Sequence, residues 1–272
     1  STSNDSIKLS EVKASRILQL SVAIWFVVTV LGQWLFAAYV AAFYGGAVAG
    51  GNFEAWNEVL NPGYQAGATM SNLAVGLHLL AALVIMVGGP LQFIPWLRVQ
   101  YPKLHRWNGR SYVMLTLLGG LTGLYMVWAH QAHEASVNKW AMSLEAALIV
   151  VAGLLVWRNA VQRKMKQHER WAMRLFLVAS GVWFFRVILM GWLLINGGPV
   201  GFDGETFTGP FLTFLGFAHY LLPLAIYEGY LWAKDRGGYR GQYLASAVLF
   251  GLTLLTVIGI FGATVGLWWP RM

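Results

Sequence analysis

Apolar residues fill long stretches of this chain, and short polar segments separate them. Each stretch holds about 20 residues or more, the length that an α-helix needs to cross the roughly 30 Å hydrocarbon core of a bilayer. The stretches cover approximately residues 17–44, 71–97, 111–129, 137–157, 171–195, 209–232 and 243–269. The pattern predicts an all-α, multi-pass membrane protein with about seven transmembrane helices. Since the spans and their short loops use almost the whole sequence, we expect residues 1–272 to form a single membrane domain.

Lysine and arginine gather in alternate polar segments. They occupy the N-terminal segment and the loops after the second, fourth and sixth spans, whereas the other loops are mainly acidic. Cytoplasmic loops of membrane proteins carry this excess of positive charge. We therefore expect a cytoplasmic N-terminus and insertion in a bacterial cytoplasmic (inner) membrane. The basic residues are Lys8, Lys13, Arg16, Arg98, Lys103, Arg106, Arg110, Arg158, Arg163, Lys164, Lys166, Arg170, Lys234, Arg236 and Arg240.

The composition excludes several classes of protein. Hydrophobic residues make up 57% of the chain and charged residues 11%, whereas a soluble domain has about 25% charged residues. The net charge of +8 follows from the loops, so the expected partner is the lipid bilayer and not nucleic acid. Cysteine is absent, which excludes disulfides, thiolate nucleophiles, iron–sulfur clusters and cysteine zinc sites.

Ionisable side chains inside the spans are candidates for function, because hydrocarbon disfavours them. His78, Glu145, Arg186 and His219 have an expected depth of roughly 10–16 Å from the outer ends of four spans. As metal ligands, His78 and His219 could hold the iron of haem b, and Arg186 could hold a haem propionate or a quinone oxygen. Glu145 could carry a proton or pair with Arg186. The alternatives are a structural polar network and a proton or ion path.

Other ionisable residues lie near the ends of spans. Glu228 lies close to the cytoplasmic end of the sixth span, at a level where Arg174 can pair with it. His130 and His133 are three residues apart at the outer end of the third span, where they could bind a surface metal.

Two histidines lie at the expected cytoplasmic surface, each beside a tryptophan and several arginines. His105 precedes the third span and His168 precedes the fifth. As neutral imidazoles they could hold a second haem near this face. With the arginines they could instead bind a lipid phosphate or an anionic substrate. The neighbouring arginines are Arg106, Arg110, Arg170 and Arg174.

The two histidine segments share a pattern of His, then Trp within three residues, then Arg. The second and third spans would then repeat the hairpin of the fourth and fifth, which favours a four-helix core over residues 71–195. An old duplication and chance similarity both explain the pattern.

Short motifs in this core resemble a known family. Residues 76–78 (GLH), 89–93 (GPLQF), 104–112 (LHRWNGRSY) and 168–174 (HERWAMR) with Arg186 resemble the predicted bacterial membrane proteins of domain of unknown function 2306. The likeness covers about residues 71–195, so the first, sixth and seventh spans lie outside it. The resemblance implies positions rather than an activity: His78, His105, Arg106, Arg110, His168, Arg174 and Arg186.

Histidines near both faces of a four-helix core resemble, in outline, the diheme cytochromes of b type. The leading hypothesis is a membrane redox protein that transfers electrons and holds haem b or a quinone between its helices. A second is a non-catalytic accessory subunit that packs against other membrane protein subunits. A third is a small anion or proton transporter. The sequence leaves open whether the protein is an enzyme.

Overall fold

A computed structural model describes residues 2–60, 63–129 and 136–272 of the chain. These residues form helices and short loops, and their extended pairing is one isolated bridge between Asp203 and Thr208. The all-α prediction is therefore confirmed. The helices are α1 (Thr2–Val40), α2 (Gly46–Ala49), α3 (Thr69–Leu91), α4 (Pro95–Gln100), α5 (Pro102–Trp128), α6 (Ser136–Val161), α7 (Met165–Ala179), α8 (Gly181–Asn196), α9 (Pro210–Arg236) and α10 (Gly238–Ala263), with single turns at Ala41–Gly45, Phe53–Glu58, Thr264–Trp268 and Trp269–Arg271.

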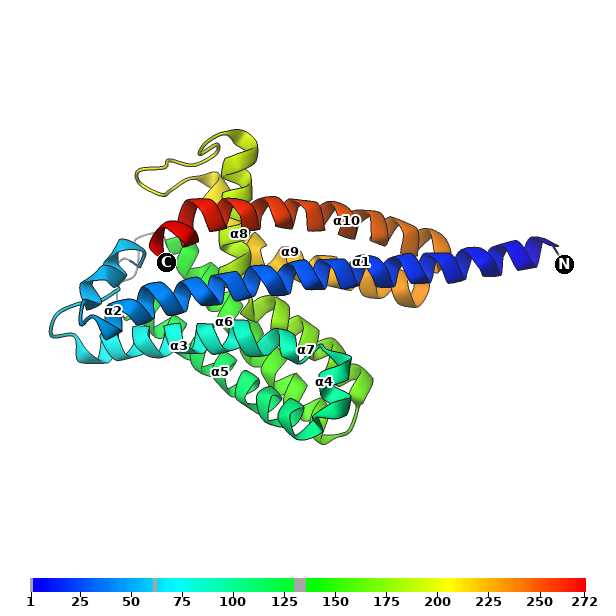
Figure 1. Cartoon of the computed structure of the whole chain (residues 1–272), viewed down its shortest axis with the longest axis horizontal. Helices are drawn as coiled ribbons and strands as arrows, with labels where there is room; N and C mark the ends of the chain where they lie inside the picture. Colours follow the sequence, from blue (N-terminus) through cyan, green and yellow to red (C-terminus); the bar gives the residue numbers. More distant parts are fainter. Residues whose placement is uncertain (1, 61–62, 130–135) are drawn as a thin grey trace.

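The number of membrane spans agrees with the prediction. Six helices are long and apolar enough to cross a bilayer, and α7 with α8 adds a seventh if this bent pair crosses as one broken span. Figure 1 places the N-terminus, α4 and the loops between α6 and α7 and between α9 and α10 toward one side of the molecule. We call this side, which carries the lysine and arginine segments, the basic end. It is the side predicted to face the cytoplasm.

The fifth span differs from the continuous helix expected over residues 171–195. It bends by 55° between α7 and α8, and Ser180 separates the two halves. A serine followed by Gly181 is a typical site for a sharp bend in a helix. The break changes the direction of every side chain that follows it.

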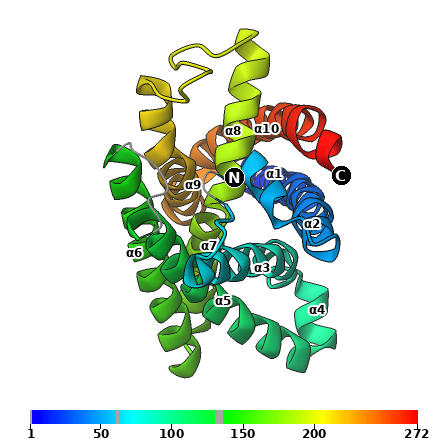
Figure 2. The same cartoon turned by 90° about the vertical axis from the view of Figure 1, so that its left-hand side faces the viewer.

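The two halves of the broken span share α9 as a neighbour but otherwise pack against different helices (Figures 1 and 2). Helix α7 joins α3, α5 and α6, which contact one another in chain order, whereas α8 packs on α10. Helices α1 and α10 run side by side, and α9 contacts α6, α7, α8 and α10. The four-helix group expected from the sequence therefore contains only the first half of the fifth span.

Helices α3 and α5 approach closely near the basic end, through residues of the family motifs. The Asn108 side chain donates a hydrogen bond to the Gly88 carbonyl at 2.8 Å. A Cβ added to Gly89 would lie 2.8 Å from the Tyr112 ring. Glycine at both positions lets the helices meet at this distance, so this part of the motif has a structural role.

Several helix boundaries differ from the prediction. Helix α5 begins at Pro102, nine residues before the expected start at residue 111, and α4 was not expected. Each begins with proline. Proline fits the first turn of a helix, because a backbone N–H at that position would have no partner within the helix. As a result, His105 lies on a helix and not in a loop.

Candidate functional site

A large cavity, with a volume of about 1250 Å³, extends from the basic end, where His105 and His168 line it, to Trp192 and Ile195 in the second half of α8. Ordinary ligand sites have volumes of about 300–1,000 Å³, so it has room for a large organic molecule. Residues from α1, from α4 to α10 and from the loop between α3 and α4 line it, and most of them are apolar. The sequence alone gave no indication of this space, because it depends on how the helices pack.

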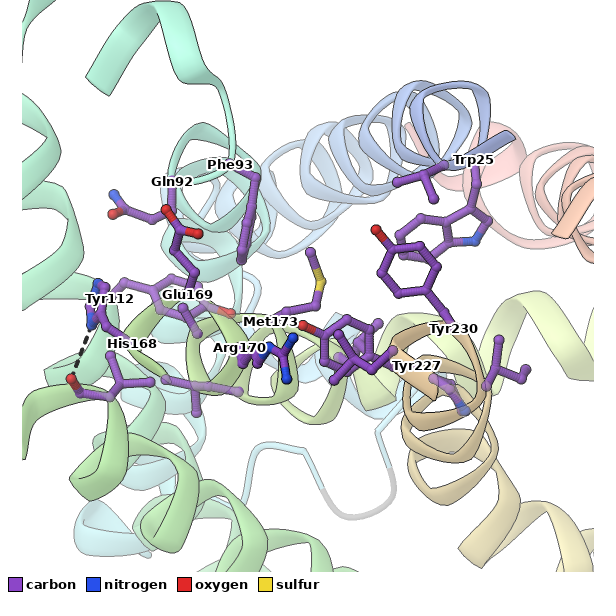
Figure 3. A pocket seen from close by; sticks show the side chains of 18 of the residues that line it. Trp25, Gln92, Phe93, Tyr112, His168, Glu169, Arg170, Met173, Tyr227 and Tyr230 are labelled. Carbon is purple, nitrogen blue, oxygen red and sulfur yellow. Dashed lines mark hydrogen bonds between the residues drawn. The ribbon is translucent and has the colours of Figure 1, made fainter. Parts of the chain in front are cut away.

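His105 and His168 line this same cavity, one from α5 and the other from α7. The Nδ1 atom of His168 lies 3.1 Å from the carbonyl oxygen of Val156 on α6 (dashed in Figure 3). Because a carbonyl oxygen only accepts, Nδ1 must donate, and in the neutral ring Nε2 keeps its lone pair. Metal-bound histidines are usually oriented by this kind of bond.

Three buried polar atoms beside the cavity have no hydrogen-bond partner. They are Gln92 Nε2, His105 Nδ1 and the Tyr112 hydroxyl, and all three residues line the cavity. A buried polar group without a partner costs about 1–3 kcal/mol. A polar ligand or a water molecule that reached these atoms would remove this cost.

Sequence reasoning did not select Gln92 or Tyr112, although both lie in the motifs that carry the family resemblance. Their position inside the family motifs was the available signal. It was missed because glutamine and tyrosine near a helix end are common, and only the packing shows that their polar atoms are buried.

Arginines surround the same cavity. Arg98 pairs with Glu169 at 2.7 Å, and Arg170 pairs with Asp235 at 2.6 Å. The ion pairs of the described residues do not include Arg106 and Arg110, which also line the cavity. These two cations are available to an acidic group of a ligand.

Arg174 forms the pair predicted from the sequence. Its Nε and Nη2 atoms donate to the two carboxylate oxygens of Glu228 at 2.7 and 3.1 Å. The guanidinium also lies 4.6 Å from the centre of the Trp171 ring. Arg174 and Glu228 are thus bound to each other and are not among the residues that line the cavity.

The cavity continues on the other side of α7. Figure 3 shows Gln92, Tyr112 and His168 on one side of Arg170 and Met173, and Trp25, Tyr227 and Tyr230 on the other. The second part is largely aromatic and apolar. The aromatic residues were also missed from the sequence, where they were indistinguishable from the tryptophan and tyrosine of a membrane interface.

The predicted outer group separates into different contacts. His219 Nε2 lies 3.3 Å from Glu145 Oε2, and its Nδ1 lies 2.9 Å from the Leu215 carbonyl. Both ring nitrogens are therefore engaged, so an iron atom on His219 would displace Glu145. His78 turns to α5, where its Nδ1 lies 3.1 Å from the Gly119 carbonyl.

Arg186 does not pair with Glu145, which was one of the alternatives considered for Glu145. Its Nη1 donates to the Val182 carbonyl at 3.1 Å, and its guanidinium lies 5.3 Å from the centre of the Phe36 ring. The reason is the break before α8, which directs this side chain toward α1 while Glu145 remains beside α9.

The structure does not test the prediction of a surface metal site at His130 and His133. His130 and His133 lie outside the described residues. Among residues 2–60, 63–129 and 136–272, no group of three or more histidine, aspartate or glutamate side chains is arranged to hold a metal ion. A haem differs from such a site, because it needs only one or two protein ligands.

Helices α3 to α8 carry His78, His105 and His168, and also the motifs at the contact between α3 and α5. Residues 75–203 match the family described as Predicted membrane protein (DUF2306). The match confirms the resemblance expected for residues 71–195. No curated protein and no solved structure matches the chain. The DUF2306 segment includes His78, His105, His168 and Arg186, whereas His219 lies beyond it.

Proposed function

We propose that this protein is a membrane electron-transfer protein that holds haem b at the basic end, with His105 and His168 as iron ligands. The observation that carries the proposal is that the two imidazoles come from different helices and line one large cavity. Ligation by two histidines from facing helices is a common way for helical membrane proteins to hold haem.

The residues around the cavity fit the chemistry of haem. His168 has its Nδ1 fixed by a carbonyl oxygen, which leaves Nε2 for the iron. Arg106 and Arg110, without ion pairs in the described residues, could hold the propionates. The unpartnered Tyr112 hydroxyl and Gln92 amide offer further polar contacts. The apolar walls would keep water from the ring.

Bound haem would supply one-electron chemistry. The role of the chain would be to hold the iron through two neutral imidazoles and to set its surroundings. An apolar cavity with a positive rim stabilises the propionates and excludes solvent.

An absorption spectrum of the protein purified in mild detergent tests the proposal. We expect a Soret band, with iron and haem b recovered by extraction. His168→Ala and His105→Ala should each lose the band or change its shape, because one ligand is removed. His78→Ala is the matched control and should keep it, since His78 lies on α3 against Gly119 and does not line the cavity.

A colourless preparation without iron, made with haem available during expression, would refute the haem proposal. So would an unchanged band in both cavity variants. Loss of the band in His78→Ala alone would instead place the haem in the outer half of the protein.

A quinone is the second candidate, and the shape of the cavity favours it. The space extends past α7 to Trp25, Tyr227 and Tyr230 (Figure 3), which suits a ring with an apolar tail. Quinone recovered in solvent extracts, and lost in Tyr112→Phe, would support this candidate. The accessory-subunit hypothesis predicts neither haem nor quinone, and the transporter hypothesis predicts uptake by liposomes that depends on Arg186.

A further inference from the structure

A second polar site lies away from the cavity, where the fifth span is broken. Glu145 on α6 and His219 on α9 meet there at 3.3 Å. Neither residue lines the cavity at the basic end. An ionisable pair inside membrane-spanning helices is disfavoured by hydrocarbon, and such residues commonly mark proton relays.

The carboxylate of Glu145 lies against the start of α8. A Cβ added to Gly181, the first residue of α8, would overlap Glu145 Oε1 and would lie 3.0 Å from His219 Cδ2. The first turn of a helix has free N–H groups and carries a partial positive charge. Glycine at this position therefore lets a carboxylate approach the end of the half-helix.

Helix α1 brings further polar atoms to the break. Gln33 donates from Nε2 to the Ser180 hydroxyl at 2.9 Å, and both residues are almost completely buried. The Gln33 Oε1 atom and the Thr29 hydroxyl are buried without a partner, and so is Trp183 Nε1 in the first turn of α8. The three atoms are an amide oxygen that accepts, a hydroxyl and an indole N–H that donates. Internal water molecules commonly bridge buried polar groups of these kinds.

We propose that Glu145 and His219 form a proton-binding site within the membrane, and that water at the break between α7 and α8 connects it to the polar atoms of α1. The ligand is a proton, which binds to the carboxylate–imidazole pair and leaves from it without any other change of bonds. The Glu145 side chain is 18% exposed and that of His219 is 7% exposed, so the carboxylate is the more accessible member.

The other ionisable groups around the pair are engaged elsewhere. Tyr220, next to His219 on α9, donates its hydroxyl proton to the Ala141 carbonyl at 3.0 Å. His78 of α3 contacts α5, and Arg186 of α8 is directed toward Phe36 of α1. None of them forms an ion pair with Glu145 in the described part of the chain. The pair itself is therefore where the proton is held.

Infrared difference spectroscopy of the purified protein, titrated from acid to alkaline pH, tests this site. We expect a carbonyl band of a protonated carboxylic acid that disappears as the pH rises. Glu145→Gln should abolish the band. Glu228→Gln is the matched control, because Glu228 pairs with Arg174 and not with a histidine. It should leave the band unchanged.

His219→Gln is the second variant. Glutamine can still contact the carboxyl group but cannot take up a proton, so it removes one of the two proton-binding groups of the pair. We expect the dependence of the band on pH to differ from that of the wild type. A circular dichroism spectrum and a single elution peak establish that each variant is folded.

The proposal is overturned if the wild-type protein shows no titrating carboxylic-acid band, or if the band survives in folded Glu145→Gln. Should Glu145→Gln fail to fold, an unchanged titration in His219→Gln overturns it. These spectra need no haem, so the proton site and the haem proposal can fail separately.

Discussion

The contact between α8 and α10 allows a prediction with a magnitude from the structure. A Cβ added to Gly259 on α10 would overlap the carbonyl oxygen of Val187 and lie 2.6 Å from its Cγ1 atom. Gly191 faces the same place, and its own Cβ would lie 3.3 Å from Gly259 Cα. Because the obstacle is the backbone of α8, Gly259→Ala must push the two helices apart.

The cost of pushing the two helices apart can be separated from the higher helix propensity of alanine. Alanine favours a helix over glycine by about 1 kcal/mol, and overpacking a tight contact costs about 1–3 kcal/mol. Gly251 lies on the same helix, and a Cβ there would meet nothing within 4 Å. Since both variants share the helix preference, Gly259→Ala should be less stable than Gly251→Ala by the overpacking cost alone, about 1–3 kcal/mol.

Equilibrium unfolding in mixed micelles, followed by circular dichroism, measures this difference. We expect Gly251→Ala to equal or exceed the wild type in its free energy of unfolding, and Gly259→Ala to fall below Gly251→Ala. If the two variants unfold at the same denaturant concentration, the close packing of α8 on α10 is refuted, and with it the position of the second half of the fifth span.

Two further predictions concern single hydrogen-bonded side chains. Asn108→Ala should lower the free energy of unfolding by about 1 kcal/mol, measured as above, because it removes the bond to the Gly88 carbonyl between α3 and α5. In the loop after α8, the backbone N–H groups of Thr206 and Glu205 hold the pKa of Asp203 below its ordinary value. The ionised Asp203 side chain should therefore hold this loop in place above the ordinary carboxyl pKa. This stabilisation should be lost as the pH falls through the lowered pKa, and cleavage of the loop by an acid protease should rise in that range. Asp203→Asn should remove that pH dependence, and equal cleavage of both proteins at every pH would contradict it.

The sequence was informative where local length and charge decide the structure. The spans follow from the number of consecutive apolar residues, and the basic segments mark one end of the molecule. The pair between Arg174 and Glu228 was predictable because helical rise alone places both near that end. The compartment that this end faces stays a prediction.

The break at Ser180 could not be predicted, because residues 171–195 read as one apolar helix and serine–glycine pairs also occur inside straight helices. The tertiary contacts explain the break: Glu145 lies against Gly181, and Gln33 donates a hydrogen bond to Ser180. The same break explains why Glu145 does not contact Arg186, which was one of the alternatives for Glu145. Positions on a single ideal helix were assumed for residues that belong to two helices.

The broken span also relates the two proposed sites to each other. His168, in the first turn of α7, lines the cavity, and α7 ends at Ala179, just before the residues that contact Glu145 and Gln33. His168 and Ala179 are 11 residue steps apart, which is about 17 Å along a straight helix. A ligand that moves α7 by binding to His168 would therefore change the geometry at Ser180 and Gly181. Because α8 is fixed to α10 by the contact at Gly259, such a movement would be taken up at the break, where the carboxylate of Glu145 lies, and not farther along the span.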